Sequence, residues 1–420
     1  MARAHVIGAG LAGLAAAIAL TKAGYAVTLS EAGPRAGGRC RSYHDPQLGL
    51  TIDNGNHLVL SGNAAVADHL ATIGAADRLA GPMEASFAFF DLRDGERWRV
   101  APNGGPLPWW LFVPGRRVPG TGVADYLPLA RLLGADADAR IGDVIATDTP
   151  LWERLIAPLM VAVMNTPPAE ASAGLAAAVI RETLAKGGRA CRPRIAHPTL
   201  AAAFVDPAIA WLRSHGADIR MGRRLKALRF AGDRVDRLDF ADGADAVATD
   251  DPVILAVPAW VAADLVPGLT VPDRHHAIVN AHFAFPPPPA LPPMLGVIGG
   301  TAEWIFAFPD RISVTISAAD RLCEEDRGAL AARLWAEVAR AAGIDAPLPP
   351  WQIVRERRAT FAATPDQDAR RPGAATAWAN LMLAGDWTRT GLPATIEGAI
   401  RSGRTAAHLA GEVARAHVSV

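Results

Sequence analysis

Residues 5–31, HVIGAGLAGLAAAIALTKAGYAVTLSE, decide the fold of this chain. An apolar strand runs into three glycines spaced as Gly8-x-Gly10-x-x-Gly13, and a helix and a second strand ending at Glu31 follow. The glycines let the backbone turn tightly and approach a pyrophosphate, which the unpaired amides at the helix start can bind. Glu31 stands 18 residues beyond Gly13, where its carboxylate can accept hydrogen bonds from both hydroxyls of a ribose. The stretch therefore predicts a dinucleotide-binding βαβ unit.

Two further segments favour FAD over NAD. GPRAGGRCRS (33–42) places Gly38 and Arg39 just after the acidic strand end. Near the C-terminus, LAGDWTRTGLPATIEGAIRSG (383–403) has a strand that delivers Asp386, a glycine turn and a long helix. An acid there can bond a ribityl hydroxyl, and the helix N-terminus can stabilise negative charge on the N1/O2 edge of a reduced flavin.

Composition excludes several other classes of protein. The 420 residues are 50% hydrophobic and 20% charged, which excludes a largely disordered chain. The formal net charge is zero, so the composition indicates no basic surface and we expect no nucleic-acid partner. The three cysteines, Cys40, Cys191 and Cys323, are far apart and form no CxxC pair, so we expect no metal and a reducing cytoplasm.

The two nucleotide motifs lie at opposite ends of the chain, and the residues between them show different sequence patterns. Helical pattern dominates residues 123–212, and short strand patterns return over 218–256 and 294–318. The fold class we predict is α/β, a Rossmann-like FAD-binding domain with an inserted mixed substrate (cap) domain. The predicted limits are 1–75, 205–270 and 375–420 for the FAD-binding domain, and 76–204 and 271–374 for the cap.

These motifs resemble the FAD-dependent amine oxidase and phytoene desaturase superfamily. In that superfamily FAD lies extended across one domain, and a second domain covers the flavin ring. The resemblance implies that FAD is contacted by residues of the glycine turns, the two acids, one arginine and two strand or helix starts: Gly8, Gly10, Gly13, Glu31, Gly38, Arg39, Leu225, Gly385, Asp386, Thr395 and Ile396.

Several segments are similar to one branch, the squalene-associated FAD-dependent desaturases, now regarded as hydroxysqualene dehydroxylases of hopanoid biosynthesis. They are IDNGNHLVLSGN (52–63), PLWERLIAPLMVAVMNTPPAEAS (150–172), GVIGGTAEWIF (296–306), RERRATFAATP (355–365) and the C-terminal motif. The resemblance implies a triterpene lipid substrate and reductive removal of an allylic hydroxyl by hydride from reduced FAD, giving squalene. A carotenoid-type polyene desaturase on the same fold is the alternative.

Such a reaction needs an acid, because hydroxide is a poor leaving group. His57 in DNGNHL (53–58) is the first candidate, with Asp53 as its orienter or alternate and Glu397 third. His57 can equally be a buried histidine bonded to a backbone carbonyl, and Asp53 a turn aspartate. Asn165 is a further candidate for holding the substrate hydroxyl. No motif assigns the electron donor that re-reduces FAD.

The segment PLPWWLFVPGRRVP (106–119) joins five consecutive apolar residues to prolines, glycines and two arginines. No amphipathic period explains burying all five from a loop, so a monotopic membrane anchor with arginines at the lipid headgroups is favoured over a buried plug. A membrane-spanning helix needs about 18 to 20 uncharged apolar residues, and no stretch of this sequence reaches that length. We therefore expect a cytoplasmic protein held peripherally on the inner face of the cell membrane.

Two other classes compete. An amine oxidase often cages its substrate between aromatic side chains, but this chain has only three tyrosines. A prenyl-binding escort protein of the same fold needs no catalytic flavin, and the intact motifs at Glu31 and Asp386 argue against it.

Overall fold

The computed structural model describes residues 2–418 and contains two main sheets. The first sheet has five strands, all parallel to their neighbours, in the order β10–β2–β1–β14–β20. Their bounds are Asp218–Arg220, Ala26–Ser30, Arg3–Ile7, Val253–Leu255 and Leu381–Leu383. A parallel sheet of this kind needs cover on both faces, which explains why β14 and β20 are apolar throughout.

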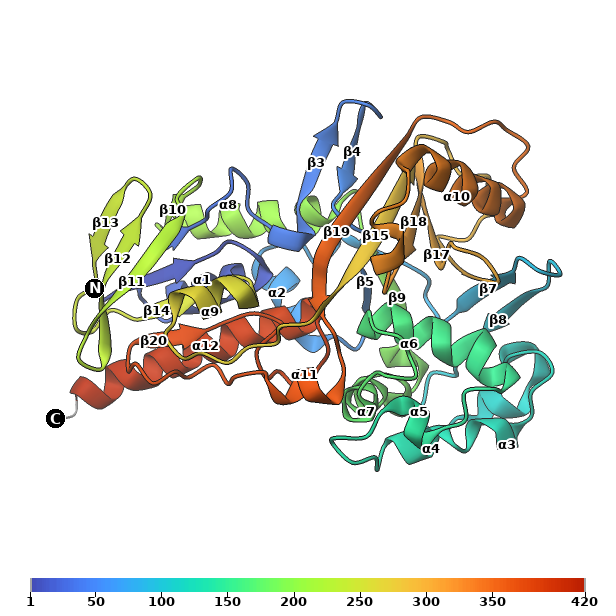
Figure 1. The fold of residues 1–420 in the computed structure, drawn as a ribbon, viewed down its shortest axis with the longest axis horizontal. Coiled ribbons are helices and arrows are strands. Elements are labelled where there is room, and N and C mark those ends of the chain that lie inside the picture. The colour runs from blue at the N-terminus through green and yellow to red at the C-terminus, as the bar shows by residue number, and fades with distance from the viewer. Residues whose placement is uncertain (1, 419–420) are drawn as a thin grey trace.

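Helix α1 (Leu11–Lys22) follows the glycine turn and is buried at nine of its twelve residues. It is apolar nearly all round because it lies against the sheet on one side and against the long helix α12 (Ile396–Val418) on another. The two helices approach closely at Gly403, where an added Cβ would lie 2.1 Å from the carbonyl oxygen of Ala12. The first and last helices of the chain therefore pack together, as Figure 1 shows for α12 beside α1.

A small antiparallel sheet extends the nucleotide-binding half, which also contains α8 (Asp206–Ser214) and α9 (Ala259–Leu265). Its strands are β11 (Leu225–Ala231), β12 (Arg234–Phe240) and β13 (Gly243–Ala246). Helix α2 (Ala64–Thr72) packs on α12.

The second main sheet has seven strands in the order β19–β15–β18–β17–β16–β7–β8. Their bounds are Trp351–Phe361, His275–Phe283, Arg311–Ile316, Trp304–Phe308, Met294–Ile298, Phe87–Asp91 and Arg97–Val100. Helix α10 (Arg327–Ala342) covers one face through a core that includes Ile305, Val314 and Trp335. Side chains of the opposite face, such as Trp304 and Phe306, share a second core with the cap helices.

The cap helices form the lower right of Figure 1. They are α3 (Val123–Tyr126), α4 (Leu129–Leu132), α5 (Ile141–Val144), the π-helical turn η4 (Trp152–Ile156), α6 (Ala157–Met164) and α7 (Ala173–Glu182). The expected helical region 123–212 is interrupted by β9 (Pro193–Ala196), which pairs with β5 (Leu58–Leu60) and β6 (Leu79–Ala80). This strand has no turn signal of its own and forms through partners far away in the sequence.

The nucleotide-binding strands come from three separated parts of the chain, and the seven-stranded sheet comes from two. This is the α/β arrangement with an inserted mixed second half that the sequence predicted. The domain limits given above stay a prediction.

Candidate flavin and substrate site

The glycine turn after β1 is shaped by close contacts at two positions and open space at a third. Gly8 has φ of 104°, and an added Cβ would lie 2.3 Å from the carbonyl oxygen of Ala256. A Cβ on Gly13 would lie 1.8 Å from the carbonyl oxygen of Gly8. At Gly10 an added Cβ would meet nothing within 4 Å. Gly10 is also the N-cap of α1 and supplies no side-chain cap, so the first amides of the helix are available to an anion.

Glu31 holds the nucleotide loop together from the end of β2. Its Oε2 accepts from the amide of Ala9 at 2.8 Å, and its Oε1 accepts from the amide of Gly33 at 2.7 Å. Each carboxylate oxygen can accept a second hydrogen bond, so the side chain is fixed in place with acceptor capacity left for a ribose.

Leu225, a predicted FAD contact, lies near this loop. It is the buried first residue of β11, and the amide of Arg223 just before it donates to the carbonyl oxygen of Glu31 at 2.7 Å. The start of β11 therefore adjoins the carboxylate expected to bind ribose.

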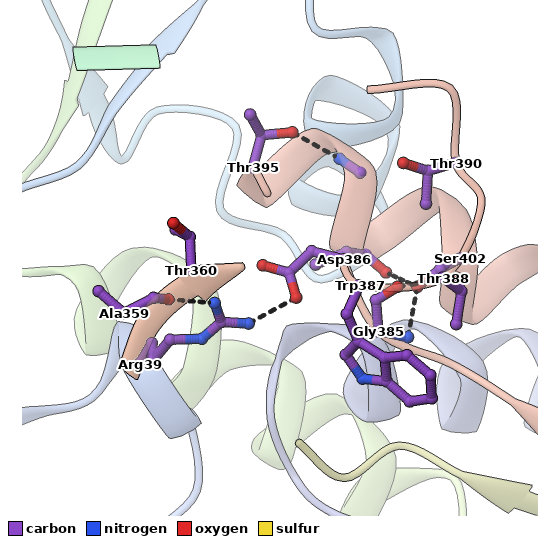
Figure 2. Close-up of polar contacts among 12 residues, drawn as sticks. Arg39, Ala359, Thr360, Gly385, Asp386, Trp387, Thr388, Thr390, Thr395 and Ser402 are labelled. Atoms are coloured by element: carbon purple, nitrogen blue, oxygen red, sulfur yellow. Dashed lines mark hydrogen bonds and ion pairs between the residues drawn. The ribbon is translucent and has the colours of Figure 1, made fainter. Parts of the chain in front are cut away.

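Arg39 and Asp386 meet across 347 positions of the chain, as Figure 2 shows. Arg39 lies in the short helical turn Gly38–Cys40, and its Nη2 donates to Oδ1 of Asp386 at 2.6 Å. Its Nη1 donates to the carbonyl oxygen of Ala359 on β19 at 2.6 Å. The pair thus joins the N-terminal motif, the C-terminal motif and the second sheet at one point.

The C-terminal loop turns sharply at Gly385. An added Cβ there would lie 2.3 Å from Nε1 of Trp387, which donates to the carbonyl oxygen of Val257 at 2.9 Å. Thr395 starts α12, since its Oγ1 accepts from the amide of Gly398 at 3.0 Å, and Ile396 is the buried first residue of the helix. A helix N-terminus and a carboxylate are therefore presented from the same loop.

These donors and acceptors fit FAD. The free amides at the start of α1 suit a pyrophosphate, the fixed carboxylate of Glu31 suits a ribose, and Asp386 with the α12 N-terminus suits the ribityl chain and flavin ring.

His57 is partly buried in the loop between β4 (Leu50–Asp53) and β5, close enough to Arg39 and Asp386 to interact with both charges. Burial, reinforced by the positive charge of Arg39, lowers the pKa of His57 to about 4, and the charge of Asp386 and a hydrogen bond to the backbone of Arg39 oppose this only in part. His57 is therefore neutral at pH 7 in this environment.

Asp53, the predicted orienter, is buried and makes its hydrogen bonds elsewhere. Its Oδ1 accepts from Oγ of Ser42 at 2.5 Å and from the amide of Leu200 at 2.9 Å, and none of the bonds within residues 2–418 joins it to His57. Burial raises the pKa of Asp53, and the hydrogen bonds from Ser42 and Leu200 and the charge of Arg311 oppose that rise. These contacts tie β4 to β3 (Ser42–Asp45) and to the 200–205 turn.

Glu397, the third candidate, is also buried, at 2% exposure. Its two oxygens accept from the amides of Ala65 and Val66 at 3.1 and 2.9 Å, at the N-terminus of α2. It also pairs with Arg401, whose Nε lies 2.8 Å from Oε1. These are the contacts of a helix cap and an ion pair, and they give Glu397 a structural role.

Asn165 ends α6 in the left-handed conformation, with φ of 45°. Its amide nitrogen donates to Oγ1 of Thr360 at 2.9 Å and to the carbonyl oxygen of His276 at 3.1 Å, and its Oδ1 accepts from the amide of Ala318 at 2.7 Å. The side chain thus fastens the cap to three strands or strand ends of the second sheet, rather than being held ready for a substrate hydroxyl.

Sequence reasoning missed Arg371. This arginine is 1% exposed and donates to backbone and side-chain oxygens of the loop 386–390. The surrounding segment DARRPG (368–373) carries no recognisable motif, and only the three-dimensional structure distinguishes Arg371 from the half-exposed Arg370 beside it.

The segment 106–119 is neither wholly exposed nor wholly buried. Its short helix η2 (Trp109–Phe112) buries Trp110 and Leu111, while Trp109 and Phe112 are 53% and 72% exposed and Leu107 is 78% exposed. Arg117 donates to the carbonyl oxygens of Thr121 and Leu111, and Arg116 donates to that of Ala101. The arginines therefore brace the segment through part of their donors, and their placement at lipid headgroups stays a prediction. Within residues 2–418, no helix is long and apolar enough to cross a membrane, and no cluster of potential metal ligands occurs.

A crevice of about 650 Å³ lies between α6 and the β16–β17 turn. It is lined mostly by apolar residues such as Pro158 and Val161, together with Glu303. The amide of Ser317 donates to Oε2 of Glu303 at 2.8 Å, and burial raises the pKa of Glu303 to about 7.

A family model described as flavin containing amine oxidoreductase matches residues 11–410. The chain therefore belongs to this family, which confirms the predicted fold class and the cofactor FAD. Solved structures agree on the fold: an oxidoreductase from Methanosarcina mazei has a TM-score of 0.71 at 15% identity, covering 96% of this chain and 98% of that one. Cyclohexylamine oxidase from Brevibacterium oxydans has a TM-score of 0.67 at 15% identity, covering 98% and 99%.

Within the family, this chain groups with the hydroxysqualene dehydroxylases. It is 57% identical to the hydroxysqualene dehydroxylase of Rhodopseudomonas palustris, covering 96% of this chain and 97% of the relative. Proteins of the same name from Zymomonas mobilis and Sinorhizobium fredii are each 52% identical, covering 98% and 97% of this chain and 99% and 97% of theirs. The shared name favours dehydroxylation over the polyene-desaturase alternative.

Proposed function

We propose that this protein is a flavoenzyme that removes the allylic hydroxyl of hydroxysqualene reductively to give squalene. The observation that carries the proposal is the identity of 52–57%, over nearly the whole chain, to three proteins named hydroxysqualene dehydroxylase. Its place in hopanoid biosynthesis is part of the same proposal.

The reaction replaces a carbon–oxygen bond by a carbon–hydrogen bond and releases water, so it consumes one hydride and one proton. Bound reduced FAD supplies the hydride. The chain's own residues must hold the allylic carbon in place, exclude water and deliver the proton to the departing oxygen.

His57 is the proton donor that we favour. Asp53 and Glu397 use their carboxylates in structural bonds, whereas His57 is partly exposed and lies near Arg39 and Asp386, beside the expected flavin position. A histidine with a pKa of about 4 is mostly neutral at pH 7, but its protonated form is a strong acid.

Anaerobic turnover tests the reaction and the acid together. We expect dithionite-reduced enzyme to convert hydroxysqualene to squalene while the flavin becomes oxidised. Because the protonated fraction of His57 rises as pH falls toward 4, the single-turnover rate should rise about tenfold per pH unit between pH 7 and 5. His57→Ala should slow the step by about 10²–10⁴-fold with FAD still bound.

Two results would contradict these proposals separately. Reduced enzyme that ignores hydroxysqualene, while oxidised enzyme desaturates a polyene, would overturn the function. A His57→Ala enzyme with normal turnover and pH profile would leave the function standing and reject His57 as the donor.

We further propose that the protein acts peripherally at the inner face of the cell membrane, where a triterpene substrate dissolves. Support comes from the exposed apolar side chains Leu107, Trp109 and Phe112 on one short segment. Burial of a large apolar side chain in lipid contributes about 1.5–3 kcal/mol, so two or three suffice for reversible binding.

Liposome sedimentation tests this contact. Trp109→Ser with Phe112→Ser should move the protein from the liposome pellet to the supernatant, because about 3–6 kcal/mol of burial is lost. The matched control is Leu348→Ser, another exposed apolar residue outside the segment, which should sediment like wild type. Equal binding by the double variant would reject the anchor.

A further inference from the structure

Arg371 is a fully buried cation in a loop-rich part of the chain. It follows α11 (Pro365–Ala369), stacks over the ring of Phe361 at 4.8 Å and pairs with Asp368 through Nη1 at 2.8 Å. A buried guanidinium is stable only when its donors are satisfied. Apart from the Asp368 pair, the hydrogen bonds that Arg371 donates all go to one loop.

That loop is the flavin-facing segment 386–390. Nη2 of Arg371 donates to the carbonyl oxygen of Asp386 at 3.1 Å and to Oγ1 of Thr390 at 2.8 Å. Nε and Nη2 both donate to the carbonyl oxygen of Thr388, and Nε lies at 2.9 Å. Only the planar, five-donor fork of arginine can reach several oxygens of one loop at once.

These hydrogen bonds determine the orientation of the loop 386–390, including the direction of the Asp386 carboxylate. The carbonyl oxygen of Asp386 accepts from Arg371. The carboxylate of Asp386 turns toward Arg39 (Figure 2). Oγ1 of Thr390 also accepts from the amide of Leu392, so the chain is fixed up to the turn that leads into α12. Arg371 touches none of the predicted FAD contacts except the backbone of Asp386.

We propose that Arg371 is a positioning residue for the flavin, which sets the loop 386–390 so that Asp386 and the α12 N-terminus meet FAD. The role concerns the bound cofactor and does not depend on the triterpene substrate. It is therefore tested on FAD binding and on the flavin's own spectrum, without turnover.

Arg371→Lys keeps the positive charge beside Asp368 and loses the fork. We expect its FAD dissociation constant to rise at least about tenfold, with a changed visible circular dichroism of the remaining bound flavin. The matched control is Arg370→Lys, since Arg370 is half-exposed and binds Asp273 and the carbonyl of Val271. The control should retain the wild-type constant and spectrum.

Thr390→Val provides a milder test that spares the buried charge. It removes one acceptor of Arg371 and should raise the FAD dissociation constant about threefold to tenfold, whereas Thr390→Ser should restore the wild-type value. If Arg371→Lys binds FAD with wild-type affinity and spectrum, the proposal is overturned. If the apo form of Arg371→Lys melts well below wild type, the Thr390 variants decide. An unchanged FAD dissociation constant for Thr390→Val overturns the proposal. A raised constant for Thr390→Val, with the wild-type value in Thr390→Ser, supports it.

Discussion

Glu303 is a carboxyl group whose charge changes near neutral pH. Burial raises its pKa from 4.5 to about 7, so the folded state binds a proton that the unfolded state releases between these values. The stabilising effect is therefore fully present below pH 4.5 and is lost as the pH rises through 7. The crevice beside Glu303 admits water, so we expect a loss of about 1–3 kcal/mol in the free energy of unfolding.

Glu303→Gln should remove this pH dependence. Urea unfolding at pH 6 and pH 8 should show the variant gaining stability relative to wild type at pH 8, because glutamine keeps an acceptor for Ser317 and carries no charge. The exposed Glu84→Gln should change little at either pH. A variant that parallels wild type at both pH values would contradict the shifted pKa.

For single residues, the sequence indicated those that stand in a local motif. It did not indicate the roles of residues whose hydrogen-bond partners are distant in the sequence. Gly8, Gly13, Glu31 and Asp386 could be singled out because spacing along one strand–turn–helix unit indicates their geometry, and their contacts with FAD stay a prediction. The roles of Asp53, Glu397 and Arg371 depend on partners 147, 331 and 15 or more positions away. No local pattern contains such partners, so a carboxylate that caps a helix looks the same in sequence as an acid.

At the scale of elements, Glu397 on α12 caps α2 and so joins two helices of the flavin-binding half. Glu397→Gln removes the charge from two amide contacts and from the Arg401 pair, and should lower the free energy of unfolding by about 2–3 kcal/mol. Turnover of the folded variant should stay near wild type, since the role is structural. Thermal unfolding and single-turnover kinetics measure the two effects.

The exposed Glu412→Gln on the same helix is the control and should leave both stability and turnover unchanged. A Glu397→Gln variant of normal stability whose chemical step slows a hundredfold would instead make Glu397 the acid.

Elements with strong periodicity or turn chemistry were predictable, and elements made by distant pairing were not. The strand at 381–383 that delivers Asp386 and the long helix that starts at Ile396 lie where the C-terminal motif predicted them. The segment 106–119 was treated as uniform because its five consecutive apolar residues, 109–113, show no alternation, yet two of them are buried and the others are exposed. Which side faces solvent is decided by packing, for example Trp110 against Tyr126 at 5.5 Å.

At the scale of the whole molecule, FAD should stabilise the fold by mass action. At a free concentration about 100 times its dissociation constant, FAD adds about 2.7 kcal/mol to the free energy of unfolding. Glu31→Gln loses one charged acceptor and should weaken binding about tenfold, which reduces that gain by about 1.4 kcal/mol at the same concentration. Thermal melts of apo-protein titrated with FAD measure both.

NADP is the control ligand in these melts and should shift the melting temperature of neither protein. Equal shifts with FAD for wild type and Glu31→Gln would remove Glu31 from the binding site, and a shift with NADP alone would contradict the cofactor.

The packing of α1 against α12 has a consequence for how the protein is made. During translation β1 and α1 leave the ribosome well before β20, the edge strand of the same sheet that pairs with β14, and α12, the helix that packs on α1. The face of α1 that α12 covers thus stays exposed until α12 has been made, and the nascent flavin-binding half cannot close earlier. A stop codon before residue 381 would remove β20 and α12, so such a truncated chain would expose α1, bind no flavin and depend on chaperones.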